Sequence, residues 1–359
     1  MRRKKVILIV TPKYPNAFSG ASIQNHKINK LLFYNYNFFI LTKNNASNNI
    51  YDGIKVVRII SIISSINIIN KVRWLILASI FLIKNKEKFD LVHVLGADSK
   101  EVLLLPIIKL LGKPIILKRA TSAEISGKKL KQIKAKIIKY TVNTVISISK
   151  EITDELNELG LKKKTVYLPN GVFIKKNVKK SLINIPIFVI IGIIRPRKGL
   201  IEAVQFLVNV NPFKNYKCII AGPVSNSLYW DQVKLLFAKF SINYNYLGPI
   251  QNNKIGELLN QATLLISMSK REGLPNIVLE AMSNGVPVIC SDIRPHREII
   301  VHNYNGMIYC KDNEKEFHRL KDNDFYKKMS VNANKSISNF DINNTKNSYD
   351  KLYARLSAE

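Results

Sequence analysis

Residues 267–292 have the sequence Ser-Met-Ser-Lys-Arg-Glu-Gly-Leu-Pro-Asn-Ile-Val-Leu-Glu-Ala-Met-Ser-Asn-Gly-Val-Pro-Val-Ile-Cys-Ser-Asp, which is typical of a strand, a loop, a helix and a second strand. Pro275 suits the first turn of the helix, because its missing N–H costs little there, and Gly285 suits the residue just past the helix end. The amides of Asn276 and Ile277 are then expected at a helix N-terminus beside the carboxyl end of a parallel strand. Anionic ligands bind at such places in open α/β sheets.

Two carboxylates frame this predicted helix, Glu272 in the loop and Glu280 within the helix. Hydroxyl groups on a nucleotide-sugar, both on the transferred sugar and on the ribose, are good donors to a carboxylate. The pattern Glu-x7-Glu, within Ser-x-x-Glu-Gly-Leu-Pro-Asn-x-x-x-Glu-Ala-Met-x-x-Gly-x-Pro-Val-Ile, resembles the signature of glycosyltransferase family four, whose members are retaining enzymes of the GT-B fold. The alternative interpretation is a capped surface loop with two solvated glutamates.

This resemblance implies a donor site built on the loop and the helix start. Glu272 would contact the donor sugar and Glu280 the ribose hydroxyls. The other donor-binding residues implied here are Gly273, Leu274, Pro275, Asn276 and Ile277.

A basic loop, Gly192-Ile-Ile-Arg-Pro-Arg-Lys-Gly199, follows a predicted strand. A loop that ends with Lys and Gly ahead of a helix can direct an ammonium group and N–H groups at a diphosphate. It is similar to the family's Gly-Arg-x(4)-Lys-Gly loop, in which Arg and Lys neutralise the leaving nucleotide diphosphate. Lys198 matches the family Lys, but Ile193 stands where the family has Arg, so we expect Arg195, or else Arg197, to replace it. A solvated basic turn is the alternative interpretation.

Two further segments of the C-terminal half, Ala221-Gly-Pro223 and Leu247-Gly-Pro-Ile250, resemble the strand ends beside the nucleotide base. Glycine there permits close approach of the backbone. The resemblance therefore adds Gly222, Pro249 and Ile250 to the expected donor site, although either segment can also be an ordinary turn.

The N-terminal half matches the family more loosely. Pro15-Asn-Ala-Phe-Ser-Gly-Ala21 resembles the loop after the first strand, which implies that Gly20 lets the backbone approach the donor phosphates. Many members have a histidine after the strand predicted at 115–117, where this chain has Lys118-Arg-Ala-Thr-Ser122. We therefore expect no histidine acid/base at that place. Arg119, Thr121 and Ser122 become candidates for the acceptor side, and His93 is expected to be a core histidine.

Short apolar runs alternate with helix-like patterns along the chain, which indicates the α/β class. A length of 359 residues suits two domains of about 150 to 200 residues each. We predict an N-terminal acceptor-side domain at 1–178, a C-terminal nucleotide-sugar-binding domain at 184–340, and a final helix in 341–359 that packs back toward the N-terminal domain. By resemblance, both domains are Rossmann-like, with doubly wound parallel sheets that face a central cleft.

The net charge of +31 is concentrated in one half of the chain. Residues 1–180 hold 34 Lys and Arg against 10 Asp and Glu, whereas residues 181–359 hold 22 against 15. Such a surface attracts nucleic acid, anionic lipid headgroups and diphosphate substrates, although compositional drift in a Lys-, Asn- and Ile-rich chain would give the same charge. A basic nucleic-acid-binding protein is a distant alternative function. Because no known nucleic-acid-reading motif appears, we expect no nucleic-acid partner.

No apolar stretch reaches the roughly 18 to 20 residues that a membrane-spanning helix needs, and the N-terminus lacks a signal-peptide pattern. We expect a cytoplasmic protein. Lysines in 128–140 interleave with Leu130, Ile133, Ile137 and Ile138, which is typical of an amphipathic helix on the anionic cytoplasmic face of the inner membrane, or of a packed helix with a solvated lysine face. The first interpretation suits a lipid-linked glycan acceptor in the assembly of cell-surface lipopolysaccharide, capsule or exopolysaccharide.

The resemblance also implies a mechanism, front-face substitution, with Glu272, Lys198 and Arg195 as the catalytic residues. The donor diphosphate leaves as the acceptor hydroxyl arrives on the same side, and a phosphate oxygen takes the proton. The cosubstrate would be a UDP- or GDP-sugar. We expect no cofactor and no metal, since Cys218, Cys290 and Cys310 show no metal-ligand spacing. The alternative enzyme is a GT-B-like nucleotide-sugar epimerase, which would isomerise its donor without an acceptor.

Overall fold

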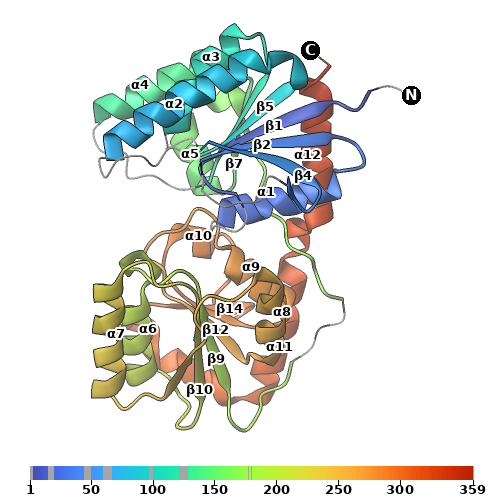
Figure 1. The fold of residues 1–359 in the computed structure, drawn as a ribbon. Helices are drawn as coiled ribbons and strands as arrows, with labels where there is room; N and C mark the ends of the chain where they lie inside the picture. The colour runs from blue at the N-terminus through green and yellow to red at the C-terminus, as the bar shows by residue number, and fades with distance from the viewer. Residues whose placement is uncertain are drawn as a thin grey trace. The chain divides into compact units, whose positions relative to one another are not determined.

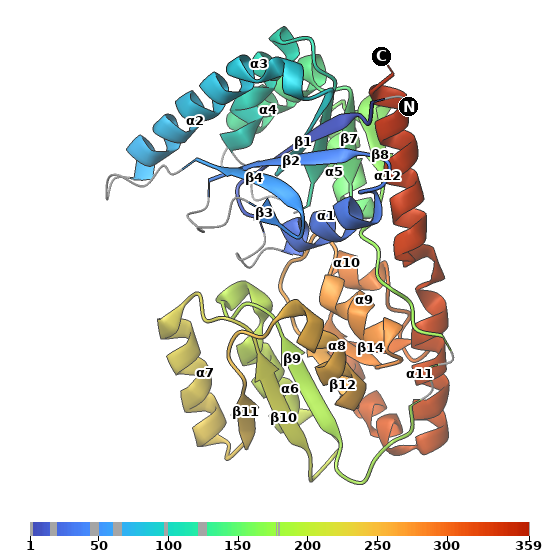
Figure 2. The same ribbon diagram turned by 45° about the vertical axis from the view of Figure 1, so that its right-hand side comes forward.

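The computed structural model describes residues 3–14, 20–43, 50–59, 67–96, 100–120, 128–176, 178 and 180–358. The chain forms two compact units: Met1–Gly171 together with Asn343–Glu359 make unit 1, and Val172–Ile342 makes unit 2. In each unit, helices cover a twisted sheet, as Figures 1 and 2 show. Val172 belongs to unit 2 because its amide donates to the carbonyl of Phe340 at 2.8 Å. The residues from 172 to 178 that we expected in the N-terminal domain therefore fall in unit 2.

The sheet of unit 1 has the strand order β3-β4-β2-β1-β5-β6-β7-β8, and every neighbouring pair is parallel except β3 with β4. Its central strands are continuous apolar runs because helices cover both faces of the sheet. The strands are β1 (Val6–Thr11), β2 (Asn37–Thr42), β3 (Ile50–Tyr51), β4 (Ile54–Arg58), β5 (Leu91–Leu95), β6 (Ile115–Arg119), β7 (Thr144–Ser147) and β8 (Thr165–Tyr167).

Helices α2, α3 and α4 lie together on one face of this sheet, and α12 lies on the other (Figures 1 and 2). The helices of unit 1 are α1 (Gly20–Leu31), α2 (Asn67–Lys84), α3 (Leu105–Leu110), α4 (Lys128–Thr141), α5 (Lys150–Glu158) and α12 (Ile342–Leu356), with short 3-10 turns η1 (Lys86–Lys88), η2 (Lys100–Leu104) and η3 (Lys162–Lys164).

The end of the chain is attached to unit 1 by side chains of α12. The hydroxyl of Tyr36 donates to the carboxylate of Asp350 at 2.8 Å, and His93 Nδ1 lies 2.9 Å from the Tyr353 hydroxyl. Burial lowers the pKa of His93 to about 3, with a smaller contribution from the positive charge of Lys118. His93 is thus a neutral residue of the core.

Unit 2 has a six-stranded, fully parallel sheet in the order β11-β10-β9-β12-β13-β14. The strands are β9 (Ile187–Ile191), β10 (Lys217–Ala221), β11 (Tyr244–Tyr246), β12 (Leu264–Ser267), β13 (Val288–Ser291) and β14 (Gly306–Tyr309). The chain builds outward from β9 to β11 and then returns to the other side of β9. The topological switch point therefore lies between β9 and β12, where ligands of open α/β sheets bind.

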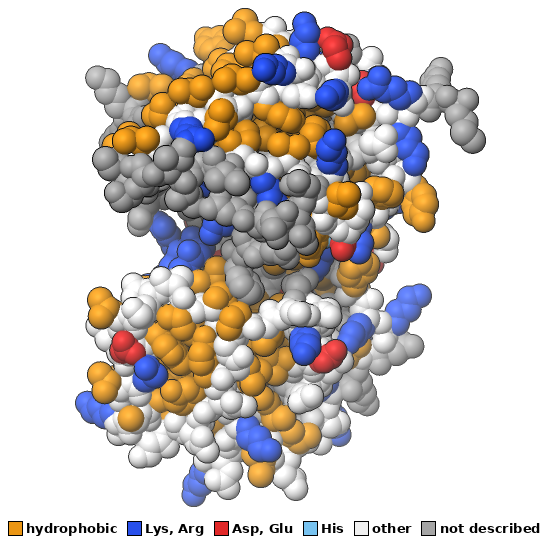
Figure 3. Space-filling model, viewed as in Figure 1, with side chains coloured by type: hydrophobic (Ala, Val, Ile, Leu, Met, Phe, Trp, Pro, Cys, Tyr) orange, Lys and Arg blue, Asp and Glu red, His pale blue; other side chains and the backbone are white. Residues whose placement is uncertain are grey.

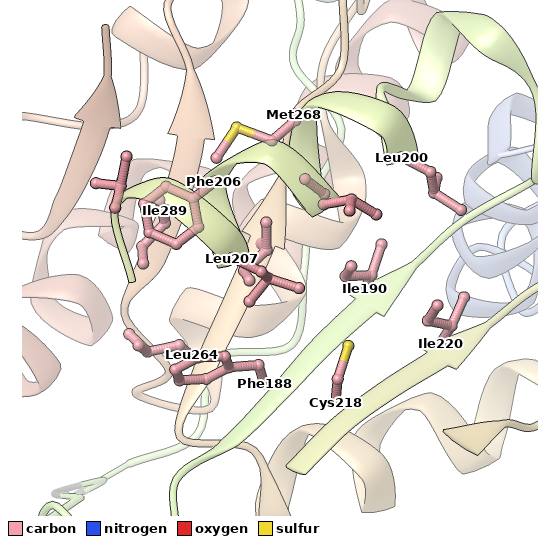
Figure 4. Packing of buried hydrophobic residues seen from close by; sticks show 14 of the residues in the cluster. Phe188, Ile190, Leu200, Phe206, Leu207, Cys218, Ile220, Leu264, Met268 and Ile289 are labelled. Atoms are coloured by element: carbon pink, nitrogen blue, oxygen red, sulfur yellow. The ribbon is translucent and has the colours of Figure 1, made fainter. Parts of the chain in front are cut away.

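Unit 2 is covered by α6 (Leu200–Asn209), α7 (Ser227–Lys239), α8 (Asn252–Gln261), α9 (Asn276–Ser283), α10 (Arg294–Arg297) and α11 (Asn323–Ser336), with 3-10 segments η4 (Pro196–Lys198), η5 (Lys311–Lys321) and η6 (Ser338–Phe340). Its core packs Phe188 of β9 and Leu264 of β12 near Phe206 of α6 (Figure 4). Burial of these side chains fixes the two strands whose ends form the switch point.

Candidate functional site

Two loops meet at the switch point of unit 2: residues 192–199 after β9 and residues 268–275 after β12. The amide of Lys270 donates to the carbonyl of Arg197 at 2.9 Å, so the loops are hydrogen-bonded to each other. Gly199 has φ +67°, and a Cβ atom there would lie 1.7 Å from the carbonyl oxygen of Met268. Only glycine combines this backbone conformation with so close an approach.

An ion pair between half-buried Lys198 and buried Glu272 joins these loops. Lys198 Nζ lies 2.6 Å from Glu272 Oε1, and the Ser269 hydroxyl donates to the same oxygen at 2.7 Å. Burial by itself raises the pKa of Glu272, but the charge and hydrogen bond of Lys198, with help from Ser269 and Arg197, outweigh it and hold this pKa below its usual range. The site therefore presents an ionised carboxylate, which is an acceptor for hydroxyl groups.

The same loops hold an excess of positive charge. Arg195 and Arg197 are both half-buried, and the Nε atom of each is buried and has no hydrogen-bond partner among the residues that the structure describes. Burial lowers the pKa of Arg197, and the neighbouring cations Arg195 and Arg271 lower it further, while Glu272 opposes them. A buried donor without a partner costs free energy, so an anion bound here would stabilise these guanidinium groups.

Helix α9 begins beside the ion pair. It starts at Asn276, with Pro275 as its N-cap residue rather than inside its first turn. The first amides of a helix, here those of Asn276 and Ile277, have no acceptor within the helix, and its dipole favours negative charge. Gly273, Leu274 and Pro275 are buried in the preceding loop. Glu280 lies further along α9 with a half-buried side chain.

The loops after β10 and β11 are connected to the basic loop. The amide of Gly192 donates to Ala221 at 2.9 Å, and the amide of Gly222 donates to Gly248 at 2.8 Å. Gly222 has φ +142°, and a Cβ atom there would lie 1.9 Å from the Gly192 carbonyl oxygen. These contacts place Gly222 within the connected loops.

Pro249 and Ile250, the other two residues expected beside the base, follow Gly248 in the loop after β11. Pro249 is exposed and Ile250 is half-buried. The loop that carries them is thus hydrogen-bonded, through Gly248, to the loop of Gly222.

His296 was not found from the sequence. It is fully buried on α10, with Nδ1 2.8 Å from the carbonyl oxygen of Ser291 and Nε2 3.5 Å from the hydroxyl of Ser267. Burial lowers the pKa of His296, although the Ser291 carbonyl and the charge of Glu272 oppose this shift. The ring is therefore neutral and donates from Nδ1. Its only sequence signal is its position shortly after β13.

The residues expected in unit 1 are less closely grouped. Gly20 is the exposed first residue of α1, and positions 15–19 of its loop lie outside the described residues. Arg119 is buried, with its guanidinium 2.6 Å from Glu155 Oε2. Thr121 and Ser122 lie outside the described residues, so the structure is silent on them.

Unit 1 also contains a buried lysine close to the end of β6. Lys118 Nζ donates to Asn170 Oδ1 at 2.9 Å and lies 5.6 Å from the centre of the Tyr349 ring. Within the described part of the chain it has no ion-pair partner. Burial lowers its pKa to about 7.

The described residues contain no group of three or more His, Cys, Asp or Glu placed to hold a metal ion. None of the helices described here combines the length and the apolar character that a membrane crossing requires.

Comparison with known proteins relates the chain to sugar-transferring enzymes. The family model described as glycosyl transferases group 1 matches residues 173–335. An uncharacterized glycosyltransferase of Methanocaldococcus jannaschii is 24% identical over 219 residues, which cover 59% of this chain and 60%, less than two thirds, of that protein. The UDP-Gal:alpha-D-GlcNAc-diphosphoundecaprenol alpha-1,3-galactosyltransferase of Escherichia coli is 22% identical over 324 residues, or 81% of each chain.

Among solved structures, HepE of Anabaena in complex with UDP-glucose superimposes with a TM-score of 0.78 at 14% identity, covering 98% of this chain and 99% of that chain. Because the sequence identity is only 14%, this similarity is evidence for the fold alone. Each unit is a parallel-sheet α/β domain, and the fold is GT-B, as expected from the sequence.

Proposed function

We propose that the protein is a glycosyltransferase that moves a sugar from a UDP- or GDP-sugar to a hydroxyl acceptor with retention of the anomeric configuration. The family match of residues 173–335 covers the loops of the switch point. The E. coli relative, whose printed name includes a UDP-sugar donor, supports the same class of reaction.

The main support for the proposal is that one ionised, buried carboxylate lies in the same two loops as several arginine and lysine side chains. Glu272 is held ionised next to Lys198, while within the described part of the chain the buried Nε atoms of Arg195 and Arg197 have no hydrogen-bond partner. A nucleotide-sugar matches both features, because its sugar hydroxyls can donate to Glu272 while its diphosphate accepts from the cations and from the start of α9.

In the proposed reaction the bond between the anomeric carbon and the diphosphate oxygen breaks, and a bond to the acceptor oxygen forms on the same face. The acceptor proton passes to a phosphate oxygen of the leaving group. Lys198 and an arginine of its loop stabilise the charge that grows on the diphosphate. This electrostatic effect is usually the largest single contribution of a site to a reaction of this kind. Glu280 is assigned to the ribose hydroxyls.

The acceptor is proposed to be a saccharide on a lipid diphosphate, in the assembly of a cell-surface polysaccharide. The printed name of the E. coli galactosyltransferase specifies a diphosphoundecaprenol-linked acceptor. That of the Campylobacter jejuni relative, 27% identical over 149 residues, does the same. An enzyme with such an acceptor would work on the cytoplasmic face of the inner membrane as a peripheral protein.

A donor screen tests this proposal. UDP-, GDP- and ADP-sugars are first compared by thermal shift, and the donor that binds is then incubated with a lipid-diphosphate-linked monosaccharide. Transfer with retention supports the proposal. A donor that is isomerised without any acceptor would identify an epimerase instead, and failure of every nucleotide-sugar to bind would contradict both functions.

A further inference from the structure

Helix α2 of unit 1 has two apolar faces, but only one of them is buried in the unit. Trp74, Ala78 and Leu82 are buried within unit 1. On the opposite side, Val72 is 51% exposed, and Ile76 and Ile83 are each 54% exposed. Ile69 and Ile80 are exposed on the same side of the helix. A helix of a soluble protein normally places polar residues on its outer face, so this apolar surface is unusual.

The exposed residues form one continuous line along the helix. Val72, Ile76, Ile80 and Ile83 follow one another at spacings of four, four and three residues, which places them above one another on successive turns. We call these residues, together with Ile69, the α2 stripe. In Figure 3, hydrophobic side chains gather over the position of α2, with Lys and Arg among them.

The surroundings of the α2 stripe are basic. Helix α2 itself contains Lys71, Arg73 and Lys84 but no Asp or Glu, and α4, in the same layer, contains six lysines and no acid. The described lysines Lys136 and Lys139 of α4 are exposed. An apolar surface next to cations alone is complementary to an anionic phospholipid bilayer, which offers both phosphate groups and acyl chains.

The α4 helix is less suited to this contact than the sequence indicates. Ala135 and Ile138 are buried in unit 1 and Ile137 is half-buried. Ile133 and Tyr140 are exposed, so α4 supplies cations with only a few apolar groups. The larger apolar surface that faces solvent belongs to α2.

We propose that the α2 stripe inserts into the headgroup region of an anionic membrane, while the lysines of α2 and α4 contact its phosphates. This inference deepens the proposed function, on which it rests for the need to reach a lipid-linked acceptor. It names the surface that would bring unit 1 to the membrane. The occupant is the bilayer and not a second copy of the chain, because the cations that surround the α2 stripe would repel their own copies at close range.

The test is flotation of the whole protein with vesicles, without any donor or acceptor. The test variant is Ile76→Glu/Ile83→Glu. The matched control is Leu228→Glu/Leu235→Glu on α7 of unit 2, where the leucines are 77% and 70% exposed and have the same spacing. Both variants exchange exposed aliphatic groups for the same two negative charges, so they differ only in location.

We expect the wild type to float with phosphatidylglycerol vesicles and much less with phosphatidylcholine vesicles. The α2 variant should lose roughly tenfold or more of its partition coefficient, since two apolar groups no longer leave water, while the α7 control stays close to wild type. Equal loss in both variants would reduce the effect to net charge and overturn the proposal. Absence of wild-type flotation would also overturn the proposal. A wild-type dimer in solution that the α2 variant abolishes would overturn it as well, because the α2 stripe would then be a dimer contact.

Thermal midpoints and nucleotide-sugar binding of the three proteins show whether the variants fold. Flotation needs no transfer reaction, so the membrane contact and the proposed glycosyltransferase function can be contradicted independently of each other. Flotation without binding of any nucleotide-sugar would contradict the proposed function alone. Donor binding without flotation would contradict the membrane contact alone.

Discussion

Each unit has a lysine amine close to the carboxyl end of a strand, and the two amines are held differently. In unit 2, Lys198 lies 2.6 Å from a carboxylate, that of Glu272. In unit 1, Lys118 donates to the neutral amide of Asn170 and faces the Tyr349 ring, and burial lowers its pKa to about 7. The amine of Lys198 thus has a carboxylate as its partner, whereas the amine of Lys118 is buried against neutral groups.

The difference supports the proposal that an anionic substrate binds to unit 2. A charge is kept buried only where a counter-charge stabilises it, and unit 2 combines such a pair with surplus arginines. The lysine of unit 1 lacks a counter-charge within the described residues, so its burial is a cost to folding that the unit tolerates.

The largest effect is expected for Lys198→Ala. Removal of this cation should lower kcat for sugar transfer by about 10²- to 10³-fold, the usual range for loss of one group that stabilises transition-state charge. Lys118→Met, which removes the buried amine of unit 1, should leave kcat close to normal. The two rates are compared by product formation at saturating donor. Equal losses would show that the two lysines do not differ in role.

The second effect concerns the close approach of the two loops in unit 2. Gly199→Ala should destabilise unit 2 by roughly 2 to 4 kcal/mol, because it adds a collision with Met268 to the strain of positive φ. Gly160→Ala is the control in unit 1, with φ +73° and no atom within 4 Å of the added Cβ. It should cost about 1 kcal/mol. Urea unfolding measures the loss of unfolding free energy in both variants. If Gly160→Ala destabilises the protein as much as Gly199→Ala does, the collision with Met268 is not the cause.

The third effect separates binding from chemistry. Glu280→Ala should raise KM for the donor by roughly 10- to 100-fold, the usual value of hydrogen bonds to a charged group, with a smaller change in kcat. The reason is that the ribose contact is made equally before and during the reaction. Steady-state kinetics at varied donor concentration decides this. A change confined to kcat would place Glu280 at the reacting bond instead.

The smallest effect is a dependence of stability on pH. The folded-state pKa of Lys118 is about 7, below the usual lysine pKa of 10.5, so between these values the unfolded chain holds a proton that the folded chain has lost. Stability should therefore rise with pH from about 7 to 9, by at most about 1.4 kcal/mol per pH unit. Lys118→Met should remove this increment. Parallel unfolding curves for both proteins across this range would contradict the assignment.

The sequence predicts the parts of unit 2 that have strong local signals. Helix α9 runs from Asn276 to Ser283 as expected, because Pro275 and Gly285 mark its ends. Helix α7 begins at Ser227, because the side chain of Asn226 accepts from the amide of Tyr229 and caps the helix. The short helix α10 and the two-residue strand β3 have too few residues to give a periodic sequence pattern.

For the site, the residue types were predictable, but most distances were not. The motifs identified Lys198 and Glu272 separately, and the strand order explains why their loops meet. The ion pair with Ser269 as a second donor is a side-chain arrangement without a sequence signal. The burial of His296 has no sequence signal either. The exposed residues of the α2 stripe are apolar like the buried residues of the same helix, and they differ from them only in their tertiary surroundings.

The most direct test of the central claim is calorimetric titration of UDP and GDP, and of the sugar derivative found in the screen, into the wild type, Lys198→Ala and Lys118→Met. One nucleotide should bind the wild type, Lys118→Met should bind it equally well, and Lys198→Ala should lose at least tenfold in affinity. Binding that is unaffected by Lys198→Ala, or abolished by Lys118→Met, would contradict the claim that unit 2 holds the diphosphate at its switch point.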